Sequence, residues 1–553
     1  MISQGDSLSL LVDEFLDEEF ELSPVSASGL GLTDYDAGMD DLSAESFAER
    51  ERDTRDFLAR FSALADADLS AEEGIDRDLA LAMLRGRLIT AEWQGWKRDP
   101  LTYSEPALNG VFLLFLHRLR PDQDLVDAAV SRLAQVPTVF AQGRANLDPA
   151  LAHPLIVERA RASARAGARY MRDLLAAEVR AVELAERLRS AGAAAAQAFD
   201  DWALFLEGFA ATAHGTWVFG EDRYSRTLHE REALPFDARR LREYGQQELD
   251  RLDAEMSDLA GRIAGTQDWR EVIEHSSHDH PLTEEAMRQA YEVWTARARD
   301  FLAARGLVTL PDGEECLVEP SPVFQRPVLG VASYMAPPAF SDSVTGHFFV
   351  PFAPDGTGPE EIDKRLSSNS HGVIPTVSVH EAYPGHHWHL VMRRIHATKL
   401  RRVLSTPYFT EGWALCSERL MREQGFFSEP IEELQHLEAT IFRAARIVVD
   451  TSLHMGEMTV DEAITFLQQR LAMAEPIARA EVGRYCAWPT QASSYLTGCL
   501  AILRIRERWL AARGLGNVAP ADVAPAVLRE FHDTLASSGA LPLGLAERVM
   551  LGE

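Results

Sequence analysis

The chain contains few cysteines and has no excess of basic residues. Its four cysteines, Cys316, Cys416, Cys486 and Cys499, form no C-x-x-C pair, which argues against zinc ribbons and a disulfide framework. The 85 acidic residues outnumber the 55 Lys and Arg and give a net charge of −30. Because such a charge repels phosphate backbones and anionic lipids, we expect no nucleic-acid partner and no membrane partner.

Long apolar stretches are also missing. No run of about 18 apolar residues occurs, so no segment is expected to span a membrane. The first residues lack the basic and apolar regions of a signal peptide. Together with reduced thiols, these features predict a cytoplasmic protein. Residues 1–50 hold thirteen Asp or Glu and one basic residue, Arg50, which is typical of a solvated face or a frayed end.

What the chain has in abundance is helical patterning. Stretches of strong helix formers with amphipathic spacing predict a mainly α protein, a large multi-helix array. The expected helical regions of the N-terminal part are 43–97, 154–211, 237–264 and 284–305. Those of the C-terminal part lie near 374–398, 411–424, 430–452, 459–474, 490–513 and 520–537.

Composition changes at about Leu307. Residues 307–355 are rich in proline, with β-branched and aromatic residues between, which is typical of a small strand-and-loop insert. Residues 346–350 are expected to form a strand, and a sheet edge there could pair with an extended peptide. We therefore divide the chain into an N-terminal helical region, 1–306, and a C-terminal region, 307–553, and expect the two to form one interlocked catalytic unit.

The most informative stretch runs from Ser378 to His387 and reads SVHEAYPGHH. It is followed by a Glu-Gly-Trp segment that begins at Glu411. A catalytic zinc site uses three nitrogen or oxygen ligands and leaves one position open. His-Glu followed by a later His, with a Glu on a later helix, is typical of zinc hydrolases with zincin-like helices. We therefore predict that His380, His386 and Glu411 bind one Zn²⁺ ion.

Two adjacent residues, His386 and His387, are candidates for the second histidine ligand. His386 follows His380 by six residues, with Pro384-Gly385 between them, so a local bulge could return it toward His380. His387 lies two turns from His380 on the same helix face, but about 10 Å along an undistorted helix. We favour His386 and keep His387 as the alternate ligand.

Several side chains have expected roles beside the metal. Glu381 adjoins a ligand and could take a proton from the attacking water and deliver it to the leaving amine. Glu418, two turns after Glu411, could hydrogen-bond a ligating imidazole or lie on the helix surface. An oxyanion could accept a hydrogen bond from one of three tyrosines: Tyr383, Tyr485 or Tyr495.

Two arginines raise the question of substrate recognition. Arg446 or Arg484 could hold a substrate carboxylate through a bidentate pair. For Arg446 we favour an ion pair with Asp450, one helical turn on, and for Arg484 a functional role. A histidine cluster at 275–280 could also bind a metal, but a solvated turn is the favoured interpretation.

These stretches resemble a known family. The segments HEAYPGHH at 380–387 and TEGWALCSE at 410–418 are similar to signatures of the bacterial family called domain of unknown function 885. Further similar stretches begin at Ser333, Arg446 and Arg484. The resemblance covers the C-terminal half well and implies a mostly α-helical, zinc-dependent peptidase.

The resemblance also implies which residues form the site. Glu381 would be catalytic, beside a metal held by His380, Glu411 and either His386 or His387. The implied cleft residues are His454, Arg484, Tyr485, Gln491 and Tyr495. We assign catalytic roles to Glu381, Tyr383, His454 and Tyr485, and substrate binding to Tyr334, Arg484, Gln491 and Tyr495. Three positions depart from the family pattern: Cys416 replaces an aromatic residue, His389 a Gln and Thr490 a Gly.

The leading hypothesis is a zinc-dependent hydrolase, a peptidase acting on peptides or short oligopeptides with Glu381 as general base. One alternative is a metal-dependent amidohydrolase of a small metabolite, and two histidines with one carboxylate also suit ferrous iron. Another is a non-catalytic binding or scaffold protein with a structural histidine cluster. The sequence predicts no particular oligomeric state.

Overall fold

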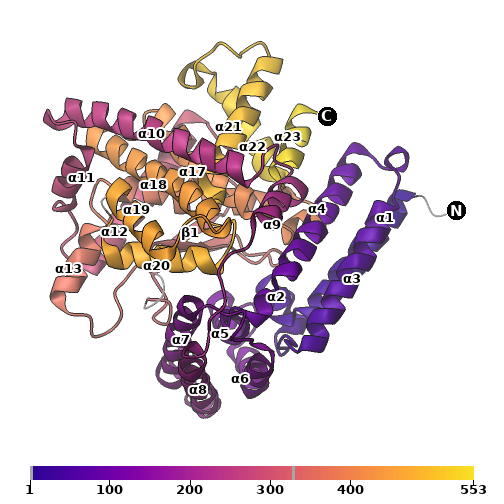
Figure 1. The fold of residues 1–553 in the computed structure, drawn as a ribbon. Coiled ribbons are helices and arrows are strands. Elements are labelled where there is room, and N and C mark those ends of the chain that lie inside the picture. The colour runs from indigo at the N-terminus through magenta and orange to yellow at the C-terminus, as the bar shows by residue number, and fades with distance from the viewer. Residues whose placement is uncertain (1–3, 327–329, 472, 553) are drawn as a thin grey trace. The chain divides into compact units, whose positions relative to one another are not determined.

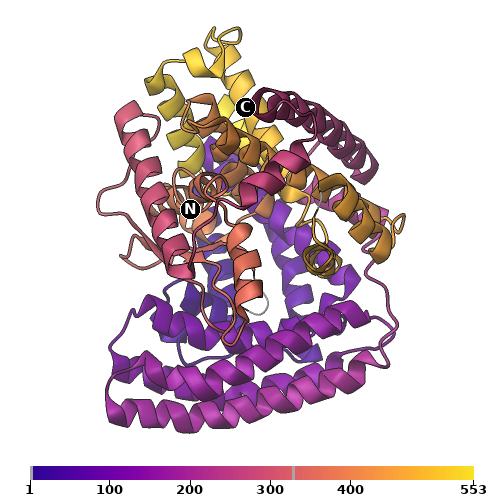
Figure 2. The ribbon, with the colours of Figure 1, turned by 90° about the vertical axis from the view of Figure 1, so that its left-hand side faces the viewer.

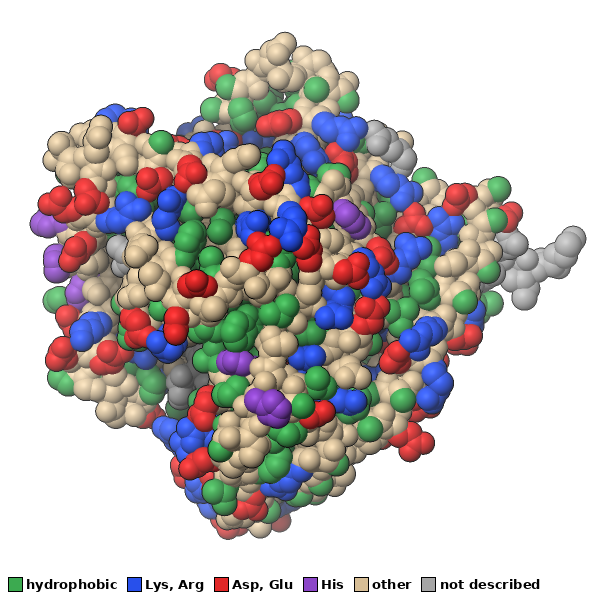
Figure 3. Space-filling view, viewed as in Figure 1, with side chains coloured by type: hydrophobic (Ala, Val, Ile, Leu, Met, Phe, Trp, Pro, Cys, Tyr) green, Lys and Arg blue, Asp and Glu red, His purple; other side chains and the backbone are tan. Residues whose placement is uncertain are grey.

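The computed structural model describes residues 4–326, 330–471 and 473–552. Helices form most of the chain, and three short strands form one sheet (Figure 1). The predicted mainly α fold with a small β insert is therefore confirmed. Within the described residues, every helix is too short or too polar to cross a membrane. Acidic and basic side chains are intermixed over the face drawn in Figure 3.

Internal contacts divide the chain into two compact units. The first comprises residues 4–217 with 322–326 and 337–343, and the second holds the other described residues. The main division therefore follows Trp217, whereas we predicted it after residue 306. Helix α10 (Ala238–Ala264) packs against α18 (Pro430–His454), and α12 (Glu284–Arg305) packs against α14 (Ile374–Glu381). These contacts place residues 218–306 with the C-terminal part of the chain.

Among the described residues, the regular elements of the first unit are all helices. The acidic N-terminal stretch forms an amphipathic helix that buries Phe15 and Leu16, so its acidic residues belong to a solvated face. Helices α6 and α7 pack along α8, and Figure 2 shows them as a layer of long rods. The helices of this unit are α1 (Gln4–Leu22), α2 (Pro24–Gly29), α3 (Ala44–Ser62), α4 (Ala71–Trp93), α5 (Leu101–His117), α6 (Asp122–Asn146), α7 (Pro154–Arg169) and α8 (Val182–Ala210).

The second unit holds most of the predicted C-terminal helices and several that we did not predict. Helix α20 (Glu475–Ala487) escaped prediction because Pro476 and Gly483 interrupt its pattern. The predicted helix at 459–474 ends earlier, at Leu471, and residue 472 lies outside the described residues. The remaining helices are α9 (Glu221–Arg226), α11 (Trp269–Ser277), α13 (Pro359–Ser367), α15 (His386–His396), α16 (Lys399–Val403), α17 (Pro407–Glu423), α19 (Val460–Leu471), α21 (Ser494–Ala512), α22 (Pro525–Ser537) and α23 (Leu543–Leu551).

The sheet has the strand order β1-β3-β2. Strand β1 (Glu315–Pro320) runs parallel to β3 (Thr345–Val350), and β2 (Ser333–Met335) runs antiparallel to it. The strand predicted at 346–350 is therefore the central one. Because β3 pairs on both sides, it offers no free edge to a peptide, and the sheet edges belong to β1 and β2. Strand β2 contacts α15 and so brings the sheet to the predicted metal helices.

Candidate metal centre

The predicted helix at 374–398 is two helices. Helix α14 ends at Glu381 and α15 begins at His386, with a cis Tyr383–Pro384 peptide between them. A Cβ on Gly385 would lie 1.9 Å from the carbonyl oxygen of His380, so this close approach requires glycine. The prediction of a continuous, bulged helix is therefore wrong, because the Pro-Gly pair ends the helix completely.

The break brings three predicted ligands together. The rings of His380 and His386 are perpendicular, with centres 4.9 Å apart. Glu411, on α17, places Oε2 3.7 Å from Nε2 of His380 and 3.4 Å from Nε2 of His386. These gaps are long for hydrogen bonds. They are close to the roughly 3.4 Å that separates ligand atoms around a tetrahedral zinc with bonds of about 2.0–2.2 Å.

Nothing else in the described residues offers such a group of His, Cys and acidic ligand atoms. The three residues therefore fit a zinc ion by their atom types and their spacing. His275 and His278 pack edge to face with ring centres 6.3 Å apart, and His280 contacts the carbonyl oxygen of Pro281. These histidines do not converge on a common point with an acidic ligand.

Glu418 orients the first histidine. One of its oxygens accepts a hydrogen bond from Nδ1 of His380 at 2.7 Å, and the other lies 3.2 Å from Nδ1 of His436. Burial disfavours the charge on Glu418, but the hydrogen bonds from the two histidines outweigh it and lower its pKa to about 2. Because Glu418 is fully buried, the alternative of a surface acid is wrong. A carboxylate at this position fixes which nitrogen faces a metal.

The ligand atoms are electrostatically coupled. Burial disfavours the charged form of each group, yet pairing with His380 and His386 holds the pKa of Glu411 far below its usual range. Against the same burial, Glu411 and Glu418 raise the pKa of His380 to about 9. These two carboxylates therefore favour a proton on His380, with which a metal would compete.

Glu381 is buried next to this group without a hydrogen-bond partner among the described residues. Burial raises its pKa, and the nearby His380 and His386 oppose that rise. A carboxylate with a raised pKa and free lone pairs is suited to accept a proton from a nearby water.

His387 belongs to a different network. Its Nδ1 lies 2.8 Å from the hydroxyl of Tyr334 and its Nε2 lies 2.8 Å from Oε2 of Glu314. Both ring nitrogens are therefore engaged, and His387 does not join the three converging ligands. Glu314 also accepts hydrogen bonds from the Tyr383 hydroxyl and from Nε of Arg299. The Tyr383 proton is already donated, so the structure does not favour its predicted role as an oxyanion donor.

Sequence reasoning missed Glu314 and Arg299. Glu314 precedes β1 in the proline-rich insert, 73 residues from His387, and no local pattern connects them. The ring of Tyr334, by contrast, was predicted to lie near the site, and it stacks on His386 at 6.4 Å between centres.

A second polar network joins α18 and α20. Nη2 of Arg446 and Nη2 of Arg484 both donate to Oε2 of Glu481, at 3.0 and 2.9 Å. The predicted pair between Arg446 and Asp450 is wrong. Asp450 instead accepts a hydrogen bond from the Tyr224 hydroxyl at 2.6 Å, because its side chain turns toward a different neighbouring helix.

The predicted catalytic roles of Tyr485 and His454 are not supported by their surroundings. The Tyr485 hydroxyl donates to Glu481 at 2.7 Å and accepts from Nε of Arg446. His454 is fully buried, and its Nε2 contacts the backbone oxygen of Tyr485 at 3.0 Å. Both residues contribute to the packing of α18 against α20, and their catalytic roles stay predictions.

Tyr495 is the predicted tyrosine whose hydroxyl proton remains available. Its ring lies nearly parallel to that of His380, with centres 6.4 Å apart. Arg484 donates from Nη1 to Oε1 of Gln491, and Nε2 of Gln491 donates to the Tyr495 hydroxyl at 3.2 Å. No described residue accepts the proton of Tyr495. The structure thus links three of the predicted substrate-binding residues in one chain of hydrogen bonds.

A family model described as bacterial protein of unknown function (DUF885) matches residues 24–550. The chain belongs to the DUF885 family. The match extends beyond the C-terminal half on which the sequence resemblance rested and includes both compact units. A search of curated proteins finds no match.

Two solved structures share the DUF885 chain's fold, and both are provisionally described as lipoproteins. The protein from Shewanella oneidensis, also described as being of unknown function, is 19% identical with a TM-score of 0.77, over 98% of this chain and 99% of its own. The protein from Colwellia psychrerythraea is 19% identical with a TM-score of 0.82, over 100% of this chain and 99% of its own. At this level of identity the likeness shows the fold alone.

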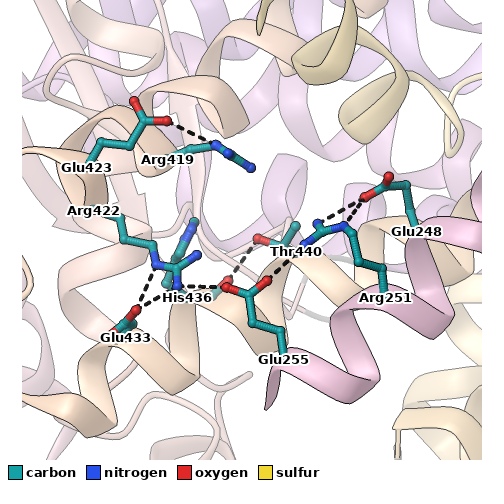
Figure 4. Close-up of polar contacts among 9 residues, drawn as sticks. All are labelled: Glu248, Arg251, Glu255, Arg419, Arg422, Glu423, Glu433, His436 and Thr440. Atoms are coloured by element: carbon teal, nitrogen blue, oxygen red, sulfur yellow. Dashed lines mark hydrogen bonds and ion pairs between the residues drawn. The ribbon is translucent and has the colours of Figure 1, made fainter. Parts of the chain in front are cut away.

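In this DUF885 protein, close packing against neighbouring helices holds α17, the helix that carries Glu411 and Glu418. A Cβ on Gly412 would lie 2.6 Å from Cα of Gly498, so α17 and α21 touch through their backbones next to Glu411. Near its other end, α17 is held by Arg422, which pairs with Glu433 of α18 and Glu255 of α10 (Figure 4). These contacts set the position from which Glu411 and Glu418 reach the histidines.

Proposed function

We propose that this protein is a zinc-dependent hydrolase that cleaves peptide bonds. The main support is the approach of His380, His386 and Glu411 at separations that suit a shared metal better than direct hydrogen bonds. The buried carboxylate of Glu381 adjoins them. When bound there, a zinc ion supplies Lewis-acid chemistry, which polarises a carbonyl and lowers the pKa of water.

Each neighbouring side chain has a role in this proposal. Glu381 takes a proton from the attacking water and passes it to the leaving amine. Tyr495 donates its hydroxyl hydrogen bond to the oxyanion that forms on the substrate carbonyl, and Gln491 holds the hydroxyl in place. Glu418 keeps Nε2 of His380 directed at Glu411.

The first test measures metal content and turnover of the purified protein. We expect about one zinc per chain, and screening a peptide library should reveal cleavage that a chelator abolishes. Glu381→Gln should retain the metal and lower kcat by roughly 10³-fold, within the range that a general base contributes. Glu475→Gln, at an exposed ion pair on α20, is the matched control and should change neither quantity.

Three results would redirect the proposal. Turnover that survives Glu381→Gln removes Glu381 from the reaction. Stoichiometric metal with cleavage of small amides but not of peptides favours the amidohydrolase alternative, and iron in place of zinc changes the cofactor. Protein without stoichiometric metal, with a stability indifferent to chelator, favours the scaffold alternative.

The cytoplasm remains our proposed location. All four cysteines are free thiols, and Cys416, Cys486 and Cys499 are buried, as expected of a reducing compartment. The two similar structures are provisionally described as lipoproteins, which makes cell fractionation of the native protein the deciding measurement. Recovery in the membrane fraction would contradict the proposal.

A further inference from the structure

The network around Glu481 has more positive than negative charge. The guanidinium groups of Arg446 and Arg484 share a single carboxylate oxygen of Glu481. The Arg446 side chain is 9% exposed and that of Glu481 is 16% exposed, so solvent compensates the extra charge poorly. Buried charges are normally paired, and the excess cation therefore calls for an anion.

Arg446 also has a free donor. Its Nε donates to the Tyr485 hydroxyl and its Nη2 to Glu481. Among the described residues, none accepts a hydrogen bond from its Nη1. One turn earlier on α18, Nε of Arg443 is buried and also has no acceptor there. A single ligand near the two arginines could accept from both.

These donors lie beside the candidate metal centre. The guanidinium carbons of Arg446 and Arg443 lie 4.7 and 5.9 Å from the ring centre of Tyr495. The Tyr495 ring is in turn 6.4 Å from that of His380. Three buried acids, Glu381, Glu418 and Glu438, lie close enough to interact with the charge of Arg443, but none of them accepts a hydrogen bond from its Nε.

We propose that Arg446, assisted by Arg443, binds the terminal carboxylate of a peptide substrate, so that the enzyme releases residues from the C-terminus. This inference rests on the proposed hydrolase function. A carboxylate carries one negative charge and matches a guanidinium group in shape. The steps of 4.7 and 6.4 Å through the Tyr495 ring keep the Arg446 guanidinium within about three extended residues of the His380 ring, at about 3.5 Å per residue.

The first experiment uses the unaltered carboxylate site. Acetyl-trialanine is prepared as the free acid and as the C-terminal amide, and binding of each to zinc-loaded Glu381→Gln protein is measured by calorimetry. We expect the acid to bind about 100-fold more tightly than the amide. Equal binding of the two peptides overturns the inference. This measurement needs no turnover.

The second experiment measures kcat/KM for the same two peptides. Arg446→Gln should reduce the acid-to-amide ratio by about 100-fold, and Arg443→Gln should reduce it by a smaller factor. Arg479→Gln, at an exposed position on α20, is the control and should keep the full ratio. If Arg446→Gln fails to fold by circular dichroism, Arg443→Gln and the acid–amide comparison in the unaltered protein decide the question.

The two experiments separate the inference from the function on which it rests. Cleavage of both peptides at equal rates leaves the hydrolase standing and overturns the carboxylate site. Selective binding of the acid without cleavage of any library peptide supports the carboxylate site and contradicts the peptidase.

Discussion

Two polar networks border the candidate metal centre, one around Glu314 and one around Glu481. In the first, Glu314 faces one permanent cation, Arg299, together with His387 and the Tyr383 hydroxyl. In the second, Glu481 faces two permanent cations. In the Glu314 network the permanent charges of Glu314 and Arg299 cancel, and the Tyr383 hydroxyl and His387 also hydrogen-bond Glu314. The Glu481 network has a charge left over.

Solvent access strengthens the contrast. The Arg299 side chain is 41% exposed, so water can take over if its partner is lost. Arg446 and Arg484 are largely enclosed and have no such exchange available. We therefore interpret the Glu314 network as a support for the sheet and the Pro-Gly segment, and the Glu481 network as the part that is open to a charged ligand.

The largest expected effect comes from removing each carboxylate in turn. Glu481→Gln leaves two enclosed guanidinium groups without an anion, and breaking such a buried pair costs about 3–5 kcal/mol of unfolding free energy. Glu314→Gln should cost less, about 1–3 kcal/mol, because Arg299 is partly exposed and can turn to water. Urea unfolding of both variants measures the difference. An equal or reversed order would contradict the contrast between the two networks.

The next largest effect on stability is expected at the backbone contact between α17 and α21. Gly412→Ala would place a Cβ against Cα of Gly498 and force α17 and α21 apart. Such overpacking costs about 1–3 kcal/mol, and it should weaken metal binding because Glu411 adjoins the contact. Gly261→Ala is the control: it lies in α10 with open space around its Cβ position, and it should gain about 0.5–1 kcal/mol. Calorimetric zinc titration and urea unfolding measure both effects.

The sequence was sufficient to predict which three side chains the fold brings together, because two short motifs carry them. His380 and His386 lie within one short stretch and Glu411 begins a second motif on α17, and in both motifs residue type and spacing indicate the chemistry. Helix-forming composition likewise predicted the mainly α fold. These three residues could be predicted even though the break between α14 and α15 was not.

The surroundings of the ligands could not be predicted in the same way. Arg446 had an acidic residue one turn away, yet it pairs with Glu481, 35 residues further on. His387 is adjacent to a predicted ligand, yet Glu314 and Tyr334 occupy its nitrogens. In each case the partner comes from a separate element, and local spacing carries no information about which element packs there.

Acid should weaken both networks. Burial raises the pKa of each carboxylate, but their hydrogen-bonded and charged partners outweigh it, so Glu314 and Glu481 both have pKa values lowered from the ordinary one. A lowered native pKa stabilises the fold above the unfolded pKa of about 4.3, and this stability is lost as pH falls through the native value.

The variants separate the two contributions to this acid sensitivity. Each unit of pKa difference corresponds to about 1.4 kcal/mol. Unfolding free energy measured between pH 6 and pH 3 should therefore fall less steeply in Glu481→Gln and in Glu314→Gln than in the unaltered protein. We expect the larger change for Glu481, since two arginines lower its pKa. Identical pH profiles in all three proteins would show that neither carboxylate contributes.

The smallest expected effect concerns the turn that precedes Gln491 in the Glu481 network. Thr490 has a φ of 70°, a left-handed conformation that is costly for a β-branched residue and that glycine adopts without steric cost. Thr490→Gly should relieve about 1–3 kcal/mol of strain against a chain-entropy cost of about 0.5–1 kcal/mol, for a net gain near 1 kcal/mol. Thr490→Ala, which keeps a Cβ, should gain less. If Thr490→Gly destabilises the protein in urea, the turn is held by contacts of the threonine side chain and is not strained, and the Gln491–Tyr495 hydrogen bond then depends on that side chain.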